Sequence, residues 1–358
     1  MKIVILADSI STQNSGIHYF GLQFVKRLIS EFPLPDYTII ASNEISEFEH
    51  VEQIIVPVRS LPMHLRWRQL FTIPRKVKRL KPDCVIELAH FGPFNLPKKI
   101  KKVTVIHDLT PIMYPEYHDR MSTFMHKLLL PKILKNADSV ICNTMHTGWD
   151  ILAYKKDLKA PIYPIYPKLE LQIINENPSI KKEYLLTIGT IEPRKNYPVL
   201  LNAFEKIAEK YPDLELIIIG KDGWKNEEFF SLLEKHPYKD RIQVMGYVKR
   251  NDMLQLISNC TLFVFTSLYE GFGIPIVEAM HFGKALVLSD IPTSREVANQ
   301  AAIYFPASSP NDLANAVIGL ITNKEIRTAL EQESKDRYLQ LQKIADKQLL
   351  NWYNSILA

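Results

Sequence analysis

The chain has 358 residues, of which 46% are hydrophobic and 23% charged, a composition typical of a globular protein with room for two domains. No apolar run approaches the roughly 20 residues of a transmembrane helix, and the N-terminal run MKIVILADS is too short for a signal peptide. Cys84, Cys142 and Cys260 lie scattered in apolar segments, which indicates buried thiols of a reducing cytoplasm rather than disulfides or a metal site.

The net charge of +5 is unevenly distributed, with 23 Lys and Arg against 15 Asp and Glu in residues 1–168, and 21 against 24 in residues 169–358. The basic residues concentrate at 59–81, which contains no acidic residue, and at 98–102. The apolar side chains among them include Leu65, Trp67, Leu70, Phe71 and Ile73.

These two stretches predict peripheral association with the anionic inner face of the cytoplasmic membrane. The alternative is a solvated helix face above a buried apolar stripe. Nucleic acid is not an expected partner, because no recognisable binding module accompanies the charge.

Apolar runs alternate with amphipathic helical patterns, which predicts parallel α/β sheets. In the first half the expected strands are Lys2–Ala7, Tyr37–Ala41, Gln53–Val58, Cys84–Leu88, Val103–His107 and Ser139–Asn143. The clearest helical patterns between them are Ile17–Ser30, Leu65–Leu80 and Met121–Asn136. A Pro-rich stretch from Pro161 to Pro178, with at most one short strand, predicts an interdomain linker.

The alternation then begins again. The expected strands are Tyr184–Ile188, Leu214–Ile219, Ile242–Met245, Leu262–Phe265, Ala285–Leu288 and Ala302–Phe305. The helices between them include Tyr197–Lys210, Glu227–His236 and Asp252–Asn259, and the chain is expected to be wholly helical from Asn311 onward.

Two glutamates eight positions apart, Glu270 and Glu278, flank a Gly-Phe-Gly turn and an apolar helical pattern. Gly271 and Gly273 permit close backbone approach, and Pro275 suits the first turn of a helix. The helix is therefore expected to begin near Pro275, with Glu278 in its first turn. Since N–H groups at a helix start favour anions, the segment predicts a site that holds a phosphate and a polyol together, as a nucleotide sugar requires.

A second motif, GTIEPRKN, runs from Gly189 to Asn196 between an expected strand and helix. Arg194 and Lys195 supply a guanidinium fork and an ammonium group for the oxygens of a diphosphate. With the helix N-terminus they can neutralise the charge of a departing nucleoside diphosphate. The sequence contains no Asp-x-Asp triplet for a divalent ion, so neither a metal nor another cofactor is expected.

The Glu-x7-Glu spacing, with GFG, Pro275 and Gly283 around it, resembles the signature of the retaining family 4 glycosyltransferases. That resemblance implies the GT-B fold, in which two Rossmann-like domains face a central cleft. The expected division is an N-terminal acceptor-binding domain at 1–168 and a nucleotide-sugar-binding domain at 169–340. A last helix at 341–358 is expected to pack back on the first domain.

The resemblance also implies roles for the motif residues. Glu270 would hold the donor sugar and stabilise the oxocarbenium-like transition state, while Glu278 would accept hydrogen bonds from the ribose hydroxyls. The backbone of Gly271, Phe272 and Gly273 would join Arg194 and Lys195 at the diphosphate. Retention in this family is attributed to front-face attack, so no nucleophilic residue is nominated.

In the first half, His107-Asp108 ends an expected strand and opens the segment HDLTP. This pattern resembles the subgroup whose histidine contacts the donor sugar, which makes His107 a candidate catalytic residue. Asp108 would orient it or bind a sugar hydroxyl, with helix capping as the alternative. Gly16, after Asn14 and Ser15, resembles the family's glycine loop near the donor phosphates, although a plain turn glycine is the alternative and no GxGxxG is present.

By the same resemblance, Gly220, Lys221, Tyr247 and Val248 would lie near the nucleobase. Recognition of a base through backbone groups leaves little signal in residue types, so UDP and GDP are hard to separate. Weaker candidates at the acceptor are Asn143, Thr144 and His146. His64, His90, His118, His126 and His281 are interpreted as structural or exposed.

Together these features predict a retaining glycosyltransferase that transfers a hexose from a nucleotide-diphosphate sugar to a glycan or lipid-linked acceptor. The combination of HDLTP, EPRKN and GKDGW resembles bacterial mannosyltransferases of surface-polysaccharide assembly, which favours GDP-mannose over UDP-glucose, UDP-N-acetylglucosamine or dTDP-rhamnose. Two alternatives stay open, a non-catalytic nucleotide-sugar-binding protein and a GT-B nucleotide-sugar epimerase. A Rossmann dehydrogenase is disfavoured because the glycine fingerprint is missing.

Overall fold

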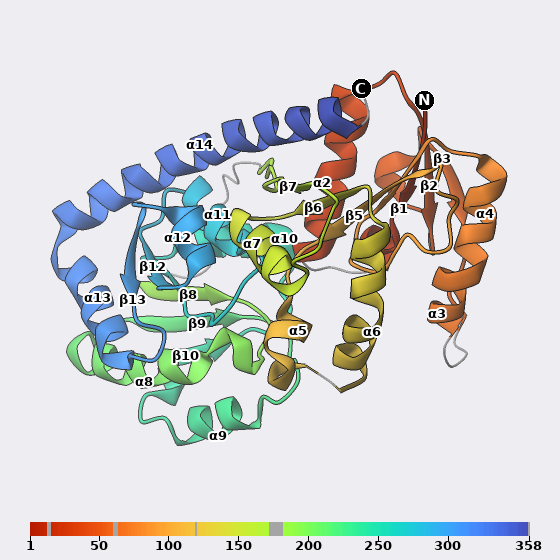
Figure 1. Ribbon diagram of the computed structural model, residues 1–358. Coiled ribbons are helices and arrows are strands. Elements are labelled where there is room, and N and C mark those ends of the chain that lie inside the picture. The colour runs from red at the N-terminus through yellow and green to blue at the C-terminus, as the bar shows by residue number, and fades with distance from the viewer. Residues whose placement is uncertain (13–15, 60–63, 119, 172–181, 357–358) are drawn as a thin grey trace. The chain divides into compact units, whose positions relative to one another are not determined.

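The computed structural model describes residues 1–12, 16–59, 64–118, 120–171 and 182–356. Asn14, Ser15 and the part of the expected linker that contains Pro178 lie outside the described residues. The chain divides into two compact units, one made of residues 1–168 and 344–358 and the other of residues 169–343. Each unit is an α/β sandwich around its own parallel sheet (Figure 1).

The first unit contains a seven-stranded sheet in the order β3-β2-β1-β4-β5-β6-β7, with every strand pair parallel. Its strands are β1 (Lys2–Leu6), β2 (Asp36–Ala41), β3 (Glu52–Ile55), β4 (Cys84–Glu87), β5 (Lys101–Ile106), β6 (Ser139–Cys142) and β7 (Ile162–Pro164). Its helices are α1 (Asp8–Thr12), α2 (Gly16–Glu31), α3 (His64–Trp67), α4 (Ile73–Leu80), α5 (Thr110–Met113), α6 (Arg120–Asn136) and α7 (Met145–Tyr154). The strand order reverses between β1 and β4, as in a doubly wound Rossmann sheet.

Alternate residues of these strands enter two different cores, because side chains of a strand point to opposite faces. Ile3 and Ile5 of β1 pack in the core that contains α2, whereas Val4 packs with Ile73 and Val77 of α4. Both faces are buried, which explains the continuous apolar runs in the sequence.

The second unit contains a six-stranded parallel sheet in the order β10-β9-β8-β11-β12-β13. Its strands are β8 (Tyr184–Ile188), β9 (Glu215–Ile219), β10 (Ile242–Val244), β11 (Leu262–Phe265), β12 (Leu286–Ser289) and β13 (Ala302–Phe305). Its helices are α8 (Tyr197–Lys210), α9 (Glu227–Lys235), α10 (Arg250–Asn259), α11 (Ile274–His281), α12 (Pro292–Ala298) and α13 (Pro310–Thr322). The order again reverses once, here between β8 and β11.

The last helix, α14 (Lys324–Ile356), begins in the second unit and ends in the first. Leu349 and Trp352 are buried in the same core as Ile3 and Phe24. Arg27 of α2 forms a 2.8 Å ion pair with Asp346. The prediction that the chain end packs on the first unit is therefore confirmed.

Several details differ from the sequence prediction. The helix expected over Leu65–Leu80 is interrupted, because residues Arg68–Thr72 form a π-helical turn between α3 and α4. The third strand ends at Ile55 rather than Val58. The helical C-terminal region is divided at Asn323, whose side chain accepts a hydrogen bond from Ile326 at the start of α14.

The three cysteines are buried and form no disulfide. In the described ranges, no helix combines the length and hydropathy needed to cross a bilayer.

Candidate active site

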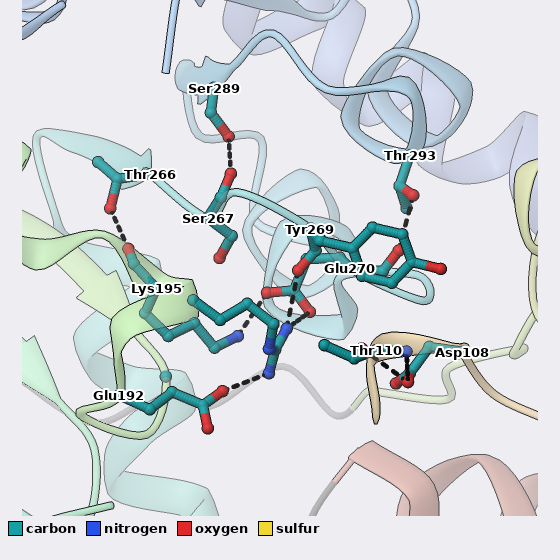
Figure 2. A network of polar contacts seen from close by, with 12 residues as sticks. Asp108, Thr110, Glu192, Lys195, Thr266, Ser267, Tyr269, Glu270, Ser289 and Thr293 are labelled. Atoms are coloured by element: carbon teal, nitrogen blue, oxygen red, sulfur yellow. Dashed lines mark hydrogen bonds and ion pairs between the residues drawn. The ribbon is translucent and has the colours of Figure 1, made fainter. Parts of the chain in front are cut away.

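Strands β8 and β11 are neighbours, with Leu185 paired to Leu262 and Leu186 to Phe263. Because the strands are parallel, the loops after their carboxyl ends lie side by side at the point where the strand order reverses. Ligands of open α/β sheets bind at this point. The topology thus brings together the loop that carries Lys195 and the loop that carries Glu270 (Figure 2).

The two loops are joined by a buried ionic cluster. Lys195 Nζ lies 2.6 Å from Glu270 Oε1, and Arg194 Nη1 lies 2.9 Å from Glu270 Oε2. The other arm of Arg194 lies 2.5 Å from Glu192 Oε1. The cluster contains two cations and two carboxylates, so its formal charges balance. A fork-like guanidinium shared between carboxylates is geometrically suited to exchange one of them for phosphate oxygens.

Hydrogen bonds from side-chain hydroxyls to backbone carbonyls fix both loops. Thr266 Oγ1 donates to the Lys195 carbonyl at 2.6 Å, and Thr293 Oγ1 donates to the Glu270 carbonyl at 2.7 Å (Figure 2). Ser289 Oγ donates to the Ser267 carbonyl at 2.6 Å. Three hydroxyls from three segments therefore hold the chain on which Glu270 and Lys195 stand, and the charged groups are pre-positioned.

The charge states follow from burial and from the neighbours. Burial alone would raise the pKa of Glu270, but Arg194 and Lys195 outweigh it and hold that pKa below its usual range. Burial lowers the pKa of Lys195, with Arg194 adding to the effect and Glu270 opposing it. Glu270 is therefore a carboxylate at neutral pH and is unsuited to act as a general acid.

Helix α11 follows the Gly-Phe-Gly turn, in which Gly273 has a φ of 87° and is the N-cap residue. That φ favours glycine over any other residue. Since α11 begins at Ile274, Glu278 is its fifth residue and lies in the second turn. The prediction of a first-turn position for Glu278 was therefore wrong.

Glu278 is 1% exposed and forms an ion pair with Arg250, the first residue of α10. Burial raises the pKa of Glu278, and Arg250 opposes this rise. Sequence reasoning missed Arg250. It lies 28 residues before its partner, and no local spacing signals the pair.

The residues expected near the nucleobase also meet at the carboxyl edge of the second sheet. Lys221 follows β9, Tyr247 follows β10, and the Lys221 ammonium lies 4.8 Å from the centre of the Tyr247 ring. Gly220 allows its backbone to pass close to Gly189, and its N–H donates to the Gly246 carbonyl at 3.0 Å. Tyr247 is 58% exposed, and Val248 is the next residue.

In the first unit His107 follows β5 and is only 2% exposed. Its Nε2 donates to the Leu88 carbonyl at 2.7 Å, and its Nδ1 lies 3.0 Å from the Asn143 amide nitrogen. Its backbone N–H donates to His90 Nε2 at 2.6 Å. Burial lowers the pKa of His107 and lowers that of His90 to about 3, so both imidazoles are neutral.

Asp108 accepts hydrogen bonds from the Thr110 backbone N–H at 2.9 Å and from its hydroxyl at 2.7 Å. The Asp108 side chain thereby satisfies the N–H of Thr110, the first residue of α5. Gly16 is the exposed first residue of α2. His90 is a contact of His107 that the sequence did not reveal, since a histidine between two strands carries no distinguishing pattern.

The expected membrane-binding stretches contain buried members. Arg68 is fully buried and paired with Asp8, and Lys102 is buried with its ammonium 3.0 Å from Asp138. Ile73 is in the core. These three residues were wrongly assigned to the exposed face, because each satisfies a tertiary contact. Leu65, Trp67 and Phe71 are exposed, as expected.

Several solved structures share the fold. Sucrose-phosphate synthase from Thermosynechococcus elongatus has a TM-score of 0.78 at 16% identity, over 99% of this chain and 98% of that one. Anabaena Alr3699/HepE in complex with UDP-glucose has a TM-score of 0.75 at 16% identity, over 99% and 100%. WaaG, a glycosyltransferase involved in lipopolysaccharide biosynthesis, has a TM-score of 0.71 at 17% identity, over 97% and 99%. The chain has the GT-B fold, as predicted.

Residues 171–337 match the family described as glycosyl transferases group 1. O-antigen chain mannosyltransferase B of Escherichia coli is 27% identical over 341 residues, which cover 87% of this chain and 88% of that protein. The serotype-specific mannosyltransferase WbdA of Escherichia coli is 26% identical over 234 residues, which cover 60% of this chain and 29% of that protein. The segment 171–337 thus resembles the group 1 glycosyltransferases, and the chain is similar to mannosyltransferases of Escherichia coli.

Proposed function

We propose that this protein is a glycosyltransferase that transfers mannose from GDP-mannose, with retention of configuration, to a glycan or lipid-linked acceptor in surface-polysaccharide assembly. The 27% identity to O-antigen chain mannosyltransferase B over most of both chains supports the choice of sugar and pathway. The observation that carries the transfer itself is the meeting of Glu270 with Arg194 and Lys195 at the reversal of the second sheet.

The donor lies along the carboxyl edge of the second sheet in this proposal. The base is near Tyr247 and Lys221, after β10 and β9, and the diphosphate is near Arg194 and Lys195, after β8. The sugar is at Glu270, after β11. The strand order β10-β9-β8-β11 supports this arrangement, because it places the three sets of residues in that spatial sequence.

Binding of the diphosphate exchanges carboxylate partners of Arg194 and Lys195 for phosphate oxygens. Glu270 is then released toward the sugar, where a carboxylate stabilises positive charge at the anomeric carbon. The two cations stabilise the departing nucleoside diphosphate. We propose that no resident metal is needed, since these cations occupy the role that a divalent ion has in other transferases.

Release of nucleoside diphosphate from a panel of donors tests the proposal. The panel is GDP-mannose, UDP-glucose, UDP-N-acetylglucosamine and dTDP-rhamnose, each with and without a lipid-linked saccharide acceptor. Wild type is expected to turn over GDP-mannose in an acceptor-dependent way and with EDTA present. Glu270→Ala and Arg194→Ala should lose about 10²-fold or more of the rate. Arg327→Ala and Glu331→Ala remove a half-buried ion pair on α14 and serve as matched controls.

The outcomes separate the alternatives. Donor binding without release of diphosphate indicates a binding protein, and a changed donor sugar without an acceptor indicates an epimerase. Near-wild-type turnover by Glu270→Ala or Arg194→Ala would overturn the site. Preference for another donor would overturn only the choice of GDP-mannose as the donor, and the assignment of the site would stand.

We also propose peripheral binding to an anionic bilayer through the exposed Leu65, Trp67 and Phe71 and the exposed basic residues around them. Wild type is expected to sediment with vesicles that contain phosphatidylglycerol, an anionic lipid, and Trp67→Ser is expected to stay mostly in the supernatant. Equal sedimentation of both proteins, or none with wild type, contradicts this part of the proposal.

A further inference from the structure

A cavity of about 230 Å³ opens in the first unit at the carboxyl ends of β1 and β4. These strands are hydrogen-bonded neighbours at the reversal of the strand order, where α/β sheets place ligands. Neither His107, Asp108 nor Gly16 lines this cavity. It is far larger than the ~30 Å³ share of one water molecule, so its size suits a small organic ligand.

Two residues that line the cavity each carry a buried polar atom without a hydrogen-bond partner in the described part of the chain. Glu87 is 7% exposed, and its Oε1 accepts a hydrogen bond from the Ala89 N–H at 2.9 Å. Among the described residues, no donor or acceptor meets hydrogen-bond geometry at Glu87 Oε2 or at the hydroxyl of Ser9, which is 3% exposed. An unsatisfied buried group costs roughly 1–3 kcal/mol, and each such group in a native structure calls for an explanation.

The cavity carries little net charge. Asp8 lines it, but the buried Arg68 binds both carboxylate oxygens of Asp8, at 2.7 Å to Oδ1, and donates from Nε to the Val56 carbonyl at 2.6 Å. Burial raises the pKa of Glu87 to about 8, with Asp8 adding to the rise and the backbone N–H groups of Ala89 and Phe91 opposing it. A neutral carboxyl group and a hydroxyl each both donate and accept. They therefore match vicinal hydroxyls better than a phosphate or an ammonium group.

The remaining wall is apolar. Ile73, Pro74 and Val77 of α4 line one part of it, and Phe91 and Phe94 line another. A pyranose ring has the same division, with C–H groups on its faces and hydroxyls at its edge. Contact of an aromatic or aliphatic wall with the C–H face removes apolar surface from water.

We propose that this cavity binds one neutral monosaccharide ring, with Glu87 and Ser9 on adjacent hydroxyls and the α4 wall against the ring face. We further infer that the ring is a sugar unit of the acceptor, a step that rests on the glycosyl transfer proposed above. The binding itself requires no donor and is testable apart from transfer.

Saturation-transfer NMR on the full chain tests the binding, with methyl α-D-mannoside, methyl α-D-glucoside and methyl β-D-N-acetylglucosaminide as probes. At least one probe should bind wild type, and Ser9→Ala and Glu87→Ala should each weaken it about tenfold. Glu87→Gln should bind within about threefold of wild type, since the amide is neutral and also donates and accepts. Glu47→Gln, an exposed carboxylate, is the matched control.

Ser9→Ala keeps the test valid if Glu87→Ala fails to fold, because removing an unpartnered hydroxyl does not leave another group unsatisfied. Absence of binding to all three probes overturns the proposal, as does unchanged binding in Ser9→Ala. Preferential binding of inorganic phosphate or of methylammonium would overturn the assignment of a neutral ligand.

Transfer measurements separate the two proposals. If the probes bind as expected but no donor releases diphosphate, the proposal that the cavity binds a monosaccharide stands and the transferase proposal fails. If transfer depends on Glu270 but the acceptor KM is unchanged in Ser9→Ala and Glu87→Ala, the acceptor assignment fails and the transferase proposal stands. GDP binding, measured by thermal shift, should be the same in wild type and in the cavity variants Ser9→Ala, Glu87→Ala and Glu87→Gln.

Discussion

Arg250 and Glu278 form an ion pair in which the carboxylate is almost fully buried and the guanidinium is one-quarter exposed. The pair joins the first residue of α10 to the second turn of α11. Burial favours the neutral form of Glu278, and Arg250 counteracts this. Glu278 is the residue expected to bind the ribose. Its charged form is favoured by Arg250, which lies outside the Glu-x7-Glu motif.

Arg250→Ala is expected to lower the free energy of unfolding by about 3 kcal/mol, because it leaves a buried carboxylate without its partner. Adding Glu278→Gln should restore part of that loss, since a neutral amide needs no counter-charge. Urea unfolding of the two single variants and the double variant gives the coupling energy. Strictly additive losses would show that the pair contributes nothing. GDP affinity measured on the same proteins should fall in both single variants, as expected if Glu278 binds the ribose.

Gly220→Ala is expected to destabilise the second unit strongly. An added Cβ would overlap the Gly189 carbonyl oxygen and lie 2.7 Å from its carbon, and both atoms belong to the backbone. A loss of roughly 3 kcal/mol or more is expected, because the β8 and β9 ends cannot separate without breaking their pairing. Gly319→Ala is the control, since no atom lies within 4 Å of its added Cβ. In the middle of α13 that change should stabilise by about 0.5–1 kcal/mol. Equal melting temperatures of the two variants would contradict the close approach.

Local patterns predict much of this fold because both faces of each sheet are buried. The helix Tyr197–Lys210 and the strand Leu262–Phe265 agree with the sequence prediction at both ends. The π-helical turn at Arg68–Thr72 was not predictable from helical periodicity, since its first side chain reaches Asp8, 60 residues earlier. Such an interruption follows from a tertiary contact.

The candidate site likewise has residues that the local sequence predicts and residues that only the tertiary structure reveals. The motifs around Lys195 and Glu270 were recognisable, because each has a characteristic local sequence at a strand end. Their 2.6 Å contact requires the β8–β11 pairing, which the sequence does not specify. Arg250 and His90 have no local signature, and each is recognised only through the residue that it contacts.

The stability of the first unit should depend on the protonation of Glu87. Its pKa in the folded chain is about 8, above the unfolded value of 4.5. Between these two values the unfolded chain binds fewer protons, so stability decreases as the pH rises, by up to about 1.4 kcal/mol per pH unit. His90 and His107, whose pKa values are lowered, contribute a slope of opposite sign. The measurement is therefore the difference between wild type and Glu87→Gln in urea unfolding from pH 5 to pH 8. Wild type should lose stability relative to the variant across this range, whereas Glu47→Gln should parallel wild type. A constant difference would contradict the raised pKa.

Trp352→Ala is expected to destabilise the first unit by about 3–5 kcal/mol, the usual cost of truncating a fully buried aromatic side chain. Trp352 is 0% exposed, its ring centre lies 5.5 Å from that of Phe24, and its Nε1 donates to Ser139 Oγ at 3.2 Å. Its removal creates a cavity where α14 meets α2 and leaves the Ser139 hydroxyl without this donor. Leu339→Ala on the same helix is the control, because Leu339 is 56% exposed and both residues favour helix. Circular dichroism melts should show a large fall in Tm for Trp352→Ala only, with Trp352→Phe intermediate because it keeps most of the packing. Similar melting temperatures for Trp352→Ala and wild type would mean that the end of α14 adds little to the stability of the first unit.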